Sequence, residues 1–192
     1  MLSAIIATHD SERSLVPTLA ALVPAAATGL LGGVVVADAG SRDATAEVAE
    51  IAGCRFMASQ QPLGARLKNA AAATRSPWLM FLRAGAVPQP GWIEAAERFI
   101  QKTEMLEGAA CAAVFRPPSA SDELRPSLAE IVRLLRVSLG GGPSPEQGLL
   151  IARRFYDALG GHSADADAEA ALLRRLGRRR MAMLPATVSF IP

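Results

Sequence analysis

The chain has 192 residues, of which 51% are hydrophobic and 20% are charged, with a formal net charge of +2 and 5% aromatic residues. This balance excludes a globally disordered chain, and neither the charge nor the aromatic content indicates a nucleic-acid-binding surface. The length suits a single domain. No stretch reaches the ~18 consecutive apolar residues of a membrane span, and the amino terminus lacks the basic region of a signal peptide, so we expect a cytoplasmic protein.

The first half of the chain alternates short apolar runs with amphipathic segments. Strands are expected at residues 2–8, 34–38, 54–59, 78–82 and 108–115. Helices are expected from Ser14, from Ser41 or Asp43, over 64–75 and over 90–102. The residues expected to face the core are Leu15, Leu19, Leu22 and Val23 in the first helix, and Ala44, Val48 and Ile51 in the second. This alternation predicts βαβ units, and therefore an α/β domain with a mostly parallel mixed sheet flanked by helices.

The second half carries weaker signals. A Pro/Ser-rich connection at 116–126 and a Gly-rich loop at 140–148 are expected to be mobile, with an amphipathic helix between them at 127–139. The remaining expected elements are a strand at 149–152, a helix from Arg153, a helix over 166–176 and a strand at 181–185. No internal repeat is present.

The turn after the first strand excludes three common nucleotide-binding loops. Residues 8–14 read Thr-His-Asp-Ser-Glu-Arg-Ser and contain no glycine. A dinucleotide-binding Rossmann turn, a P-loop and the loop of a nucleotidyltransferase all need glycines at this place. What remains is a sheet that binds a nucleoside through carboxylates at its strand ends.

Four stretches, in this order, resemble family-2 glycosyltransferases of GT-A fold. The segments IIATHDSERSL (5–15), VVVADAGSRDAT (34–45) and QPLGARLKNAAAATRSPWLMFL (61–82) are similar to the first strands and turns of that family. The segment EQGLLIARRFYDALGG (146–161) resembles a late stretch of a short bacterial subgroup. The resemblance implies one GT-A-like (Rossmann-like) domain over 1–192, with a nucleotide-binding half at 1–105 and an acceptor-side half at 106–192.

The resemblance also implies roles for residues at the strand ends. Asp38 would accept hydrogen bonds from the uracil or ribose of a UDP-like donor, and Thr8, Asp10 and Glu12 would line the same crevice. Ser41, with Asp43, would hold the following turn. Simple roles in the turn and in helix capping are the alternatives for these side chains.

The helix at 64–75 carries two basic residues, Arg66 and Lys68. In the family, a basic residue of this helix approaches the diphosphate of the donor. The resemblance therefore implies donor binding by Arg66, whereas a solvated helix face explains Lys68 equally well.

The sequence departs from the family after the fourth strand. The family places Asp-x-Asp there, and these acids hold Mg²⁺ or Mn²⁺ against the diphosphate. Here Arg83 and Gly85 stand at those positions, so the ligands of the metal expected from the family are missing. Arg83 could itself be the cation, because a guanidinium pairs bidentately with phosphate and keeps its charge. The alternative is an Arg83 that faces solvent or pairs with Glu94 or Glu97.

The catalytic base is displaced as well. The family supplies it from Glu-Asp at the start of a late helix, and here the corresponding stretch offers Asp165 and Asp167, with Glu169 and His162 nearby. A carboxylate at this place would take the proton of the acceptor hydroxyl. The alternative is that these acids only stabilise the start of the helix.

The resemblance implies transfer of a sugar from a nucleotide-diphospho-sugar to an acceptor hydroxyl with inversion, with or without metal. The alternative is a non-catalytic module that binds a nucleotide or sugar and acts through a partner. The acceptor is not specified by the sequence, and a lipid-linked acceptor is one option. The basic run Arg174–Arg180 is expected to be a solvated helix end, with peripheral contact to an anionic membrane as the second interpretation.

Overall fold

The computed structural model describes residues 1–106, 112–116, 144–165 and 167–191. The helix expected at 127–139, and most of the two connections beside it, therefore lie outside the described residues. Within them, no helix is long and apolar enough to cross a bilayer.

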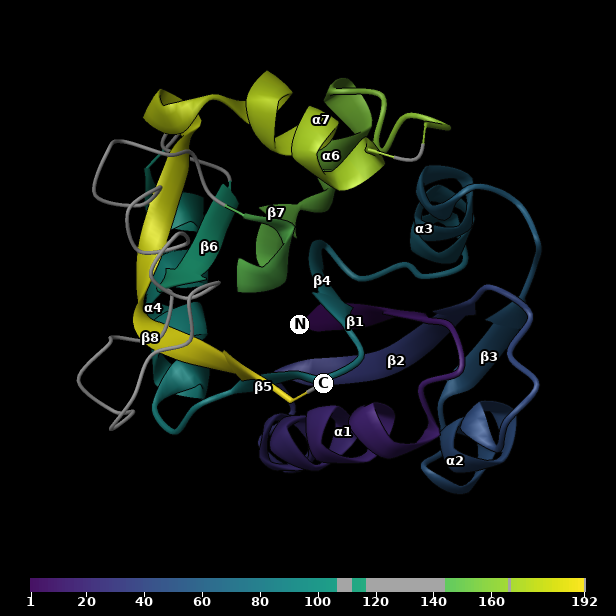
Figure 1. Ribbon diagram of the computed structural model, residues 1–192. Helices are drawn as coiled ribbons and strands as arrows, with labels where there is room; N and C mark the ends of the chain where they lie inside the picture. The colour runs from purple at the N-terminus through teal and green to yellow at the C-terminus, as the bar shows by residue number, and fades with distance from the viewer. Residues whose placement is uncertain (107–111, 117–143, 166, 192) are drawn as a thin grey trace, which may run out of the picture.

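The first four strands form the parallel part of the sheet (Figure 1). They are β1 (Leu2–Thr8), β2 (Leu31–Asp38), β3 (Arg55–Ala58) and β4 (Trp78–Arg83). Continuous apolar runs form these strands because helices cover both faces of the sheet, so both faces of β1 and β4 are buried. These strands confirm the predicted β-α-β organisation.

The second part of the sheet is mixed. It contains β5 (Ala86–Pro88), β6 (Ala112–Arg116), β7 (Leu149–Ala152) and β8 (Met181–Phe190). The order among the described strands is β3-β2-β1-β4-β7-β6-β8-β5, and β7 runs antiparallel to both β4 and β6. The strand expected at 181–185 continues past Pro185, where the pairing of β6 with β8 is irregular, and its last residues pair with β5.

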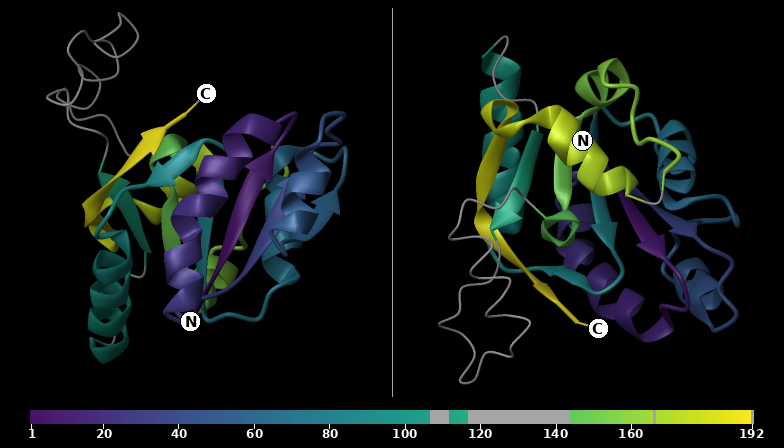
Figure 2. Two further views of the ribbon diagram at one scale, coloured as in Figure 1. Left: turned by 90° about the horizontal axis from the view of Figure 1, so that it is seen from below. Right: turned by 45° about the horizontal axis from the view of Figure 1, so that its top comes forward.

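Helices pack on both faces of the sheet (Figures 1 and 2). One face carries α1 (Glu12–Ala27), α2 (Thr45–Ile51) and α4 (Trp92–Met105), and the other carries α3 (Leu63–Ala72), α6 (Arg153–Ala158) and α7 (Ala168–Leu176). Short 3₁₀ turns are present at η2 (Pro145–Gln147) and η3 (Arg178–Arg180). Two buried apolar clusters, one on each face, hold these layers together.

Two inward-facing predictions were wrong. Val23 is 63% exposed and Ile51 is 81% exposed. Helix α1 begins at Glu12, so Ser14 lies inside it rather than at its cap, and α1 continues through Pro24. Val23 lies beside the buried face of α1, and Ile51 lies away from the buried Thr45 and Ala49 of α2.

Candidate functional site

The carboxyl ends of β1, β2 and β4 meet at one edge of the sheet. In the strand register Thr8 lies beside Asp38, and Ala7 lies beside Arg83. Open α/β sheets bind ligands in the crevice outside these strand ends. Three residues predicted from the sequence, Thr8, Asp38 and Arg83, therefore lie together at the carboxyl ends of neighbouring strands.

Asp38 is fully buried at the end of β2, and both of its carboxylate oxygens are engaged by the protein. Thr8 Oγ1 donates to Oδ1 at 2.8 Å, as does Ser41 Oγ at 2.5 Å, and the backbone N–H groups of Gly40 and Ser41 donate to Oδ2 at 2.7 Å each. Burial alone would raise the pKa of the carboxyl, but the bonds from Ser41, Thr8 and Gly40 outweigh it and hold the pKa below its usual value. Asp38 thus organises the turn after β2.

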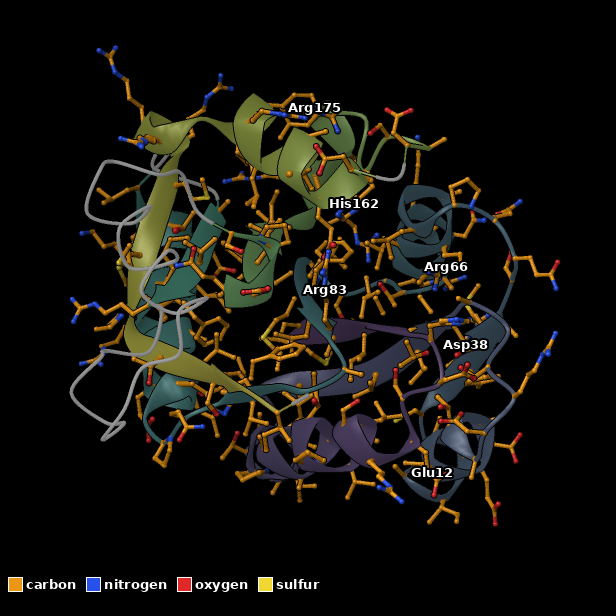
Figure 3. All side chains as sticks on the ribbon, viewed as in Figure 1. Glu12, Asp38, Arg66, Arg83, His162 and Arg175 are labelled. Carbon is orange, nitrogen blue, oxygen red and sulfur yellow. The ribbon has the colours of Figure 1, made fainter. Side chains whose placement is uncertain are left out.

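The turns after β1 and β2 are tied together by Asp10 and its neighbours. The Asp10 N–H donates to Ser41 Oγ at 2.8 Å, and the Arg42 N–H donates to Asp10 Oδ1 at 2.8 Å. The Glu12 N–H donates to Asp43 Oδ2 at 2.9 Å. Asp10 has φ of 47°, in the left-handed region. Glu12 lies beside α2 and away from the other labelled residues (Figure 3).

Ser41 and Asp43 do not occupy the cap position of α2, which belongs to Ala44. Asp43 still accepts from the Thr45 N–H at 3.1 Å and from Thr45 Oγ1 at 2.5 Å, so it stabilises the start of the helix. Its pKa is lowered, chiefly by the bond from the Thr45 hydroxyl. The same two side chains therefore hold both turns and the first turn of α2.

Arg66 reaches from α3 across the ends of β1 and β2. Its Nη1 donates to the backbone oxygens of Ala37 at 2.5 Å and Thr8 at 3.4 Å, and its Nε donates to Gln61 O at 3.2 Å. Burial lowers its pKa, and the charge of Asp38 partly offsets this. Lys68, on the same helix, is exposed. Arg66 therefore places a half-buried positive charge at the carboxyl ends of β1 and β2.

Arg83, at the end of β4, pairs with Glu169 on α7 and not with Glu94 or Glu97. Its Nε donates to Glu169 Oε2 at 2.9 Å, and its Nη2 contacts the same oxygen. The hydrogen bond to Glu169 raises the pKa of Arg83, burial opposes it, and the charges of Glu169 and Glu146 add to the rise. The Arg83 side chain is 40% exposed and that of Glu169 is 11% exposed. This pair joins the two halves of the sequence.

The two acids favoured by the sequence lie outside this centre. Asp165 and Asp167 are exposed, and Asp167 stands at the start of α7 with its Oδ2 3.1 Å from Arg174 Nη2. Glu169 is the acid of this segment that reaches Arg83. The sequence alone could have pointed to Glu169. It precedes the buried Leu172 and Leu173 by three and four residues, and so lies on the same face of the helix.

His162 is a buried, neutral histidine beside the same centre. The Tyr156 hydroxyl accepts from the His162 backbone N–H at 3.2 Å and shares a second hydrogen bond of 2.9 Å with His162 Nδ1. Burial, with the charge of Arg175, lowers the pKa of His162 to about 4, and burial raises that of Tyr156 to about 12. His162 and Glu169 both line a small cavity of about 10 Å³ whose walls include Phe81 and Leu173.

The basic run is only partly available to a partner. Arg174 pairs with Asp167, and the guanidinium of Arg175 donates to the backbone oxygens of Leu159 at 2.8 Å and Gly161 at 2.6 Å. These bonds satisfy carbonyls after α6. The exposed charge of the run is therefore concentrated in η3, at Arg178–Arg180.

The residues after β4 do not fit a divalent metal ion. Gly85 has φ of 90°, and a Cβ there would lie 2.1 Å from the backbone oxygen of Ile191, so an aspartate cannot replace it without rebuilding the turn. The other aspartate of the family motif is replaced by Arg83. Its guanidinium has no acceptor atom for a metal ion and is bonded to the Glu169 carboxylate. Across the described part of the chain, no three His, Cys, Asp or Glu side chains are grouped to hold a metal.

Comparison with solved structures shows the same fold in three mycobacterial structures. A glucosyl-3-phosphoglycerate synthase from Mycobacterium tuberculosis, in complex with Mn²⁺, UDP and glucosyl-3-phosphoglycerate, has a TM-score of 0.72 at 19% identity, over 100% of this chain and 72% of that chain. Its phosphoglyceric acid complex has a TM-score of 0.69 at 20% identity, over 95% and 68%. A crystal structure described only as a mycobacterial protein gives 0.69 at 20%, over 100% and 68%.

These likenesses confirm the predicted GT-A-like domain. None of the curated proteins matches the chain. The family model described as "Glycosyl transferase family 2", however, matches residues 3–175. The chain therefore belongs to glycosyl transferase family 2.

Proposed function

We propose that this protein transfers a sugar from a UDP-like nucleotide-diphospho-sugar to an acceptor hydroxyl, and that Arg83 replaces the metal ion of related enzymes. The observation that carries this proposal is the pairing of Arg83, at the end of β4, with the carboxylate of Glu169 on α7. It places one cation and one acid together at the edge of the sheet where the family holds its donor. The similarity to a synthase crystallised with UDP supports the choice of donor.

The donor diphosphate lies against Arg66 and Arg83 in this proposal. Both guanidinium groups are partly buried at the strand ends, and both keep their charge at neutral pH. A guanidinium bonds two phosphate oxygens at once and can stabilise the charge that develops on the leaving diphosphate. Asp10 and the turn held by Asp38 form the neighbouring wall, against which the nucleoside packs.

Glu169 is the proposed base, in place of Asp165 and Asp167. The acceptor oxygen attacks the anomeric carbon from the side opposite the diphosphate, and its proton passes to the Glu169 carboxylate. The bond between that carbon and the phosphate oxygen breaks, and its electron pair leaves with the nucleoside diphosphate. One displacement inverts the anomeric configuration. The buried, neutral imidazole of His162 lines the same small cavity as Glu169.

A non-catalytic nucleotide-binding module is the second candidate. It is favoured by the same ion pair, because Glu169 and Arg83 neutralise each other in the free protein. In that case the crevice binds a nucleotide and no donor is turned over. Nucleoside-diphosphate binding without release of UDP from any donor, in the presence of candidate acceptors or of water alone, supports this second candidate.

Replacing Arg83 by alanine tests the proposed donor site. UDP binding should weaken by about 1.5–3 kcal/mol, or roughly 10- to 150-fold, because the diphosphate loses a charged hydrogen-bond partner. Binding of uridine should be unchanged, and Arg83→Lys should recover only part of the loss. Isothermal titration calorimetry measures all three. Arg98→Ala, on the exposed side of α4, is the control of equal charge. Equal losses for UDP and uridine would contradict the role given to Arg83.

A further inference from the structure

In the free protein, Arg83, the proposed donor-binding cation, and Glu169, the proposed base, form an ion pair with each other. Nε and Nη2 of Arg83 both contact Oε2 of Glu169, so one carboxylate oxygen receives two donors. While this pair is closed, the guanidinium presents less of its charge to a diphosphate. The same pair keeps the carboxylate from an acceptor proton.

The two partners differ in how far they can move. Glu169 is 11% exposed and lies on a helix whose neighbouring leucines are buried, whereas Arg83 is 40% exposed at the end of a strand. A second acid, Glu146 of η2, acts on Arg83 through its charge. The more exposed arginine side chain is therefore the partner with room to move, while the mostly buried Glu169 keeps its place on α7.

We propose that donor binding exchanges this ion pair: the diphosphate draws the Arg83 guanidinium away from Glu169 and thereby releases the carboxylate as the base. This inference rests on the proposed function. A diphosphate carries more charge than a carboxylate and offers paired oxygens to the guanidinium, so it competes for Arg83 effectively. The acceptor proton then passes to Glu169 only when the donor is in place, which couples proton transfer to occupancy of the donor site.

An ion pair that is exchanged for the donor and an ion pair that only holds Arg83 in place predict different effects on donor binding. If Glu169 only holds Arg83 in the orientation that binds diphosphate, removal of its charge should weaken donor binding. If Glu169 competes with the diphosphate for Arg83, removal of its charge should strengthen donor binding. The two possibilities therefore predict opposite signs for one substitution.

The first experiment measures UDP binding to Glu169→Gln by calorimetry. The glutamine keeps the size of the side chain and removes the charge, so we expect UDP to bind about three- to tenfold more tightly than to the unaltered protein. The gain should disappear when Arg83→Ala is added to Glu169→Gln, because the effect acts through the guanidinium. Glu94→Gln, on exposed α4, changes the net charge equally and should leave the affinity within twofold. Weaker binding to Glu169→Gln overturns the exchange.

The second experiment follows the ion pair without a nucleoside. The Arg83 Nε–H signal is observed by ¹⁵N–¹H NMR, with Arg83→Lys used to assign it, and inorganic pyrophosphate is titrated in. The signal should shift toward its position in free Glu169→Gln as pyrophosphate binds. A signal that pyrophosphate and UDP both leave unmoved overturns the exchange. An exchange with pyrophosphate but no binding of UDP or UDP-sugars contradicts the proposed donor and leaves the exchange supported, so the two failures are distinguishable.

Discussion

Replacing Glu169 by glutamine is expected to lower the rate of sugar transfer by about 10²- to 10⁴-fold, the usual contribution of a general base. Glutamine cannot take a proton, whereas the diphosphate site keeps Arg83 and Arg66. The loss should therefore appear in kcat at saturating donor, while donor affinity should rise because the Arg83 guanidinium is no longer paired with a carboxylate. Release of UDP from a UDP-sugar, with an acceptor or with water, measures the rate.

The other acids of the segment serve as comparisons for this substitution. Asp165→Asn and Asp167→Asn change exposed side chains of the same charge, one of which pairs with Arg174. Both should retain the rate within about twofold, since exposed ion pairs contribute little. A large loss of rate in either variant, with activity kept in Glu169→Gln, would show that Asp165 or Asp167 is the base, as the sequence suggested.

Replacing Asp38 by alanine is expected to lower the free energy of unfolding by about 3–5 kcal/mol, in the range of a broken buried hydrogen-bond network. The substitution leaves four donors without their acceptor: the hydroxyl groups of Thr8 and Ser41 and the N–H groups of Gly40 and Ser41. Urea denaturation at pH 7 measures the loss. Asp157→Ala, exposed on α6, is the control. A loss below about 1 kcal/mol would contradict the structural role of Asp38.

The same network predicts the direction of a pH dependence. Hydrogen bonds hold the pKa of Asp38 below its usual value in the folded protein, so the unfolded chain binds the proton more readily. The contribution of Asp38 is complete above about pH 4, the ordinary pKa of an aspartate, and is lost as the pH falls through the lower folded value. The difference in stability between the unaltered protein and Asp38→Ala should therefore shrink at low pH.

The strands were predictable from local pattern wherever the pattern was continuous. β1 and β7 match the expected residues, and β2 and β4 differ only at their ends, because runs such as residues 78–82 are apolar on both faces. β5 was not expected. It has only three residues and exists because Val188–Phe190 pair with it from the far end of the chain. Short elements of this kind depend on tertiary contacts that no local pattern contains.

In the candidate site, too, local contacts were predictable from the sequence and long-range contacts were not. The turn after β2 was predictable because Asp38 and Ser41 are three residues apart and bond each other locally. The partner of Arg83 was not, since Glu169 lies 86 residues away and reaches it only through the packing of α7. The close packing at Gly85 could not be predicted either, because it is caused by the backbone of Ile191, which follows the last strand.

The affinity for UDP measured by calorimetry, once with EDTA and once with Mn²⁺, distinguishes a donor site built on Arg83 from one that needs a metal ion. If Arg83 supplies the cation that a metal supplies in related enzymes, UDP should bind in EDTA, and Mn²⁺ should change the affinity by less than about threefold, well under the 1.4 kcal/mol of a tenfold effect. Binding that appears only with Mn²⁺ would contradict the role of Arg83 as the cation and would require a metal-binding acid that reaches the donor site.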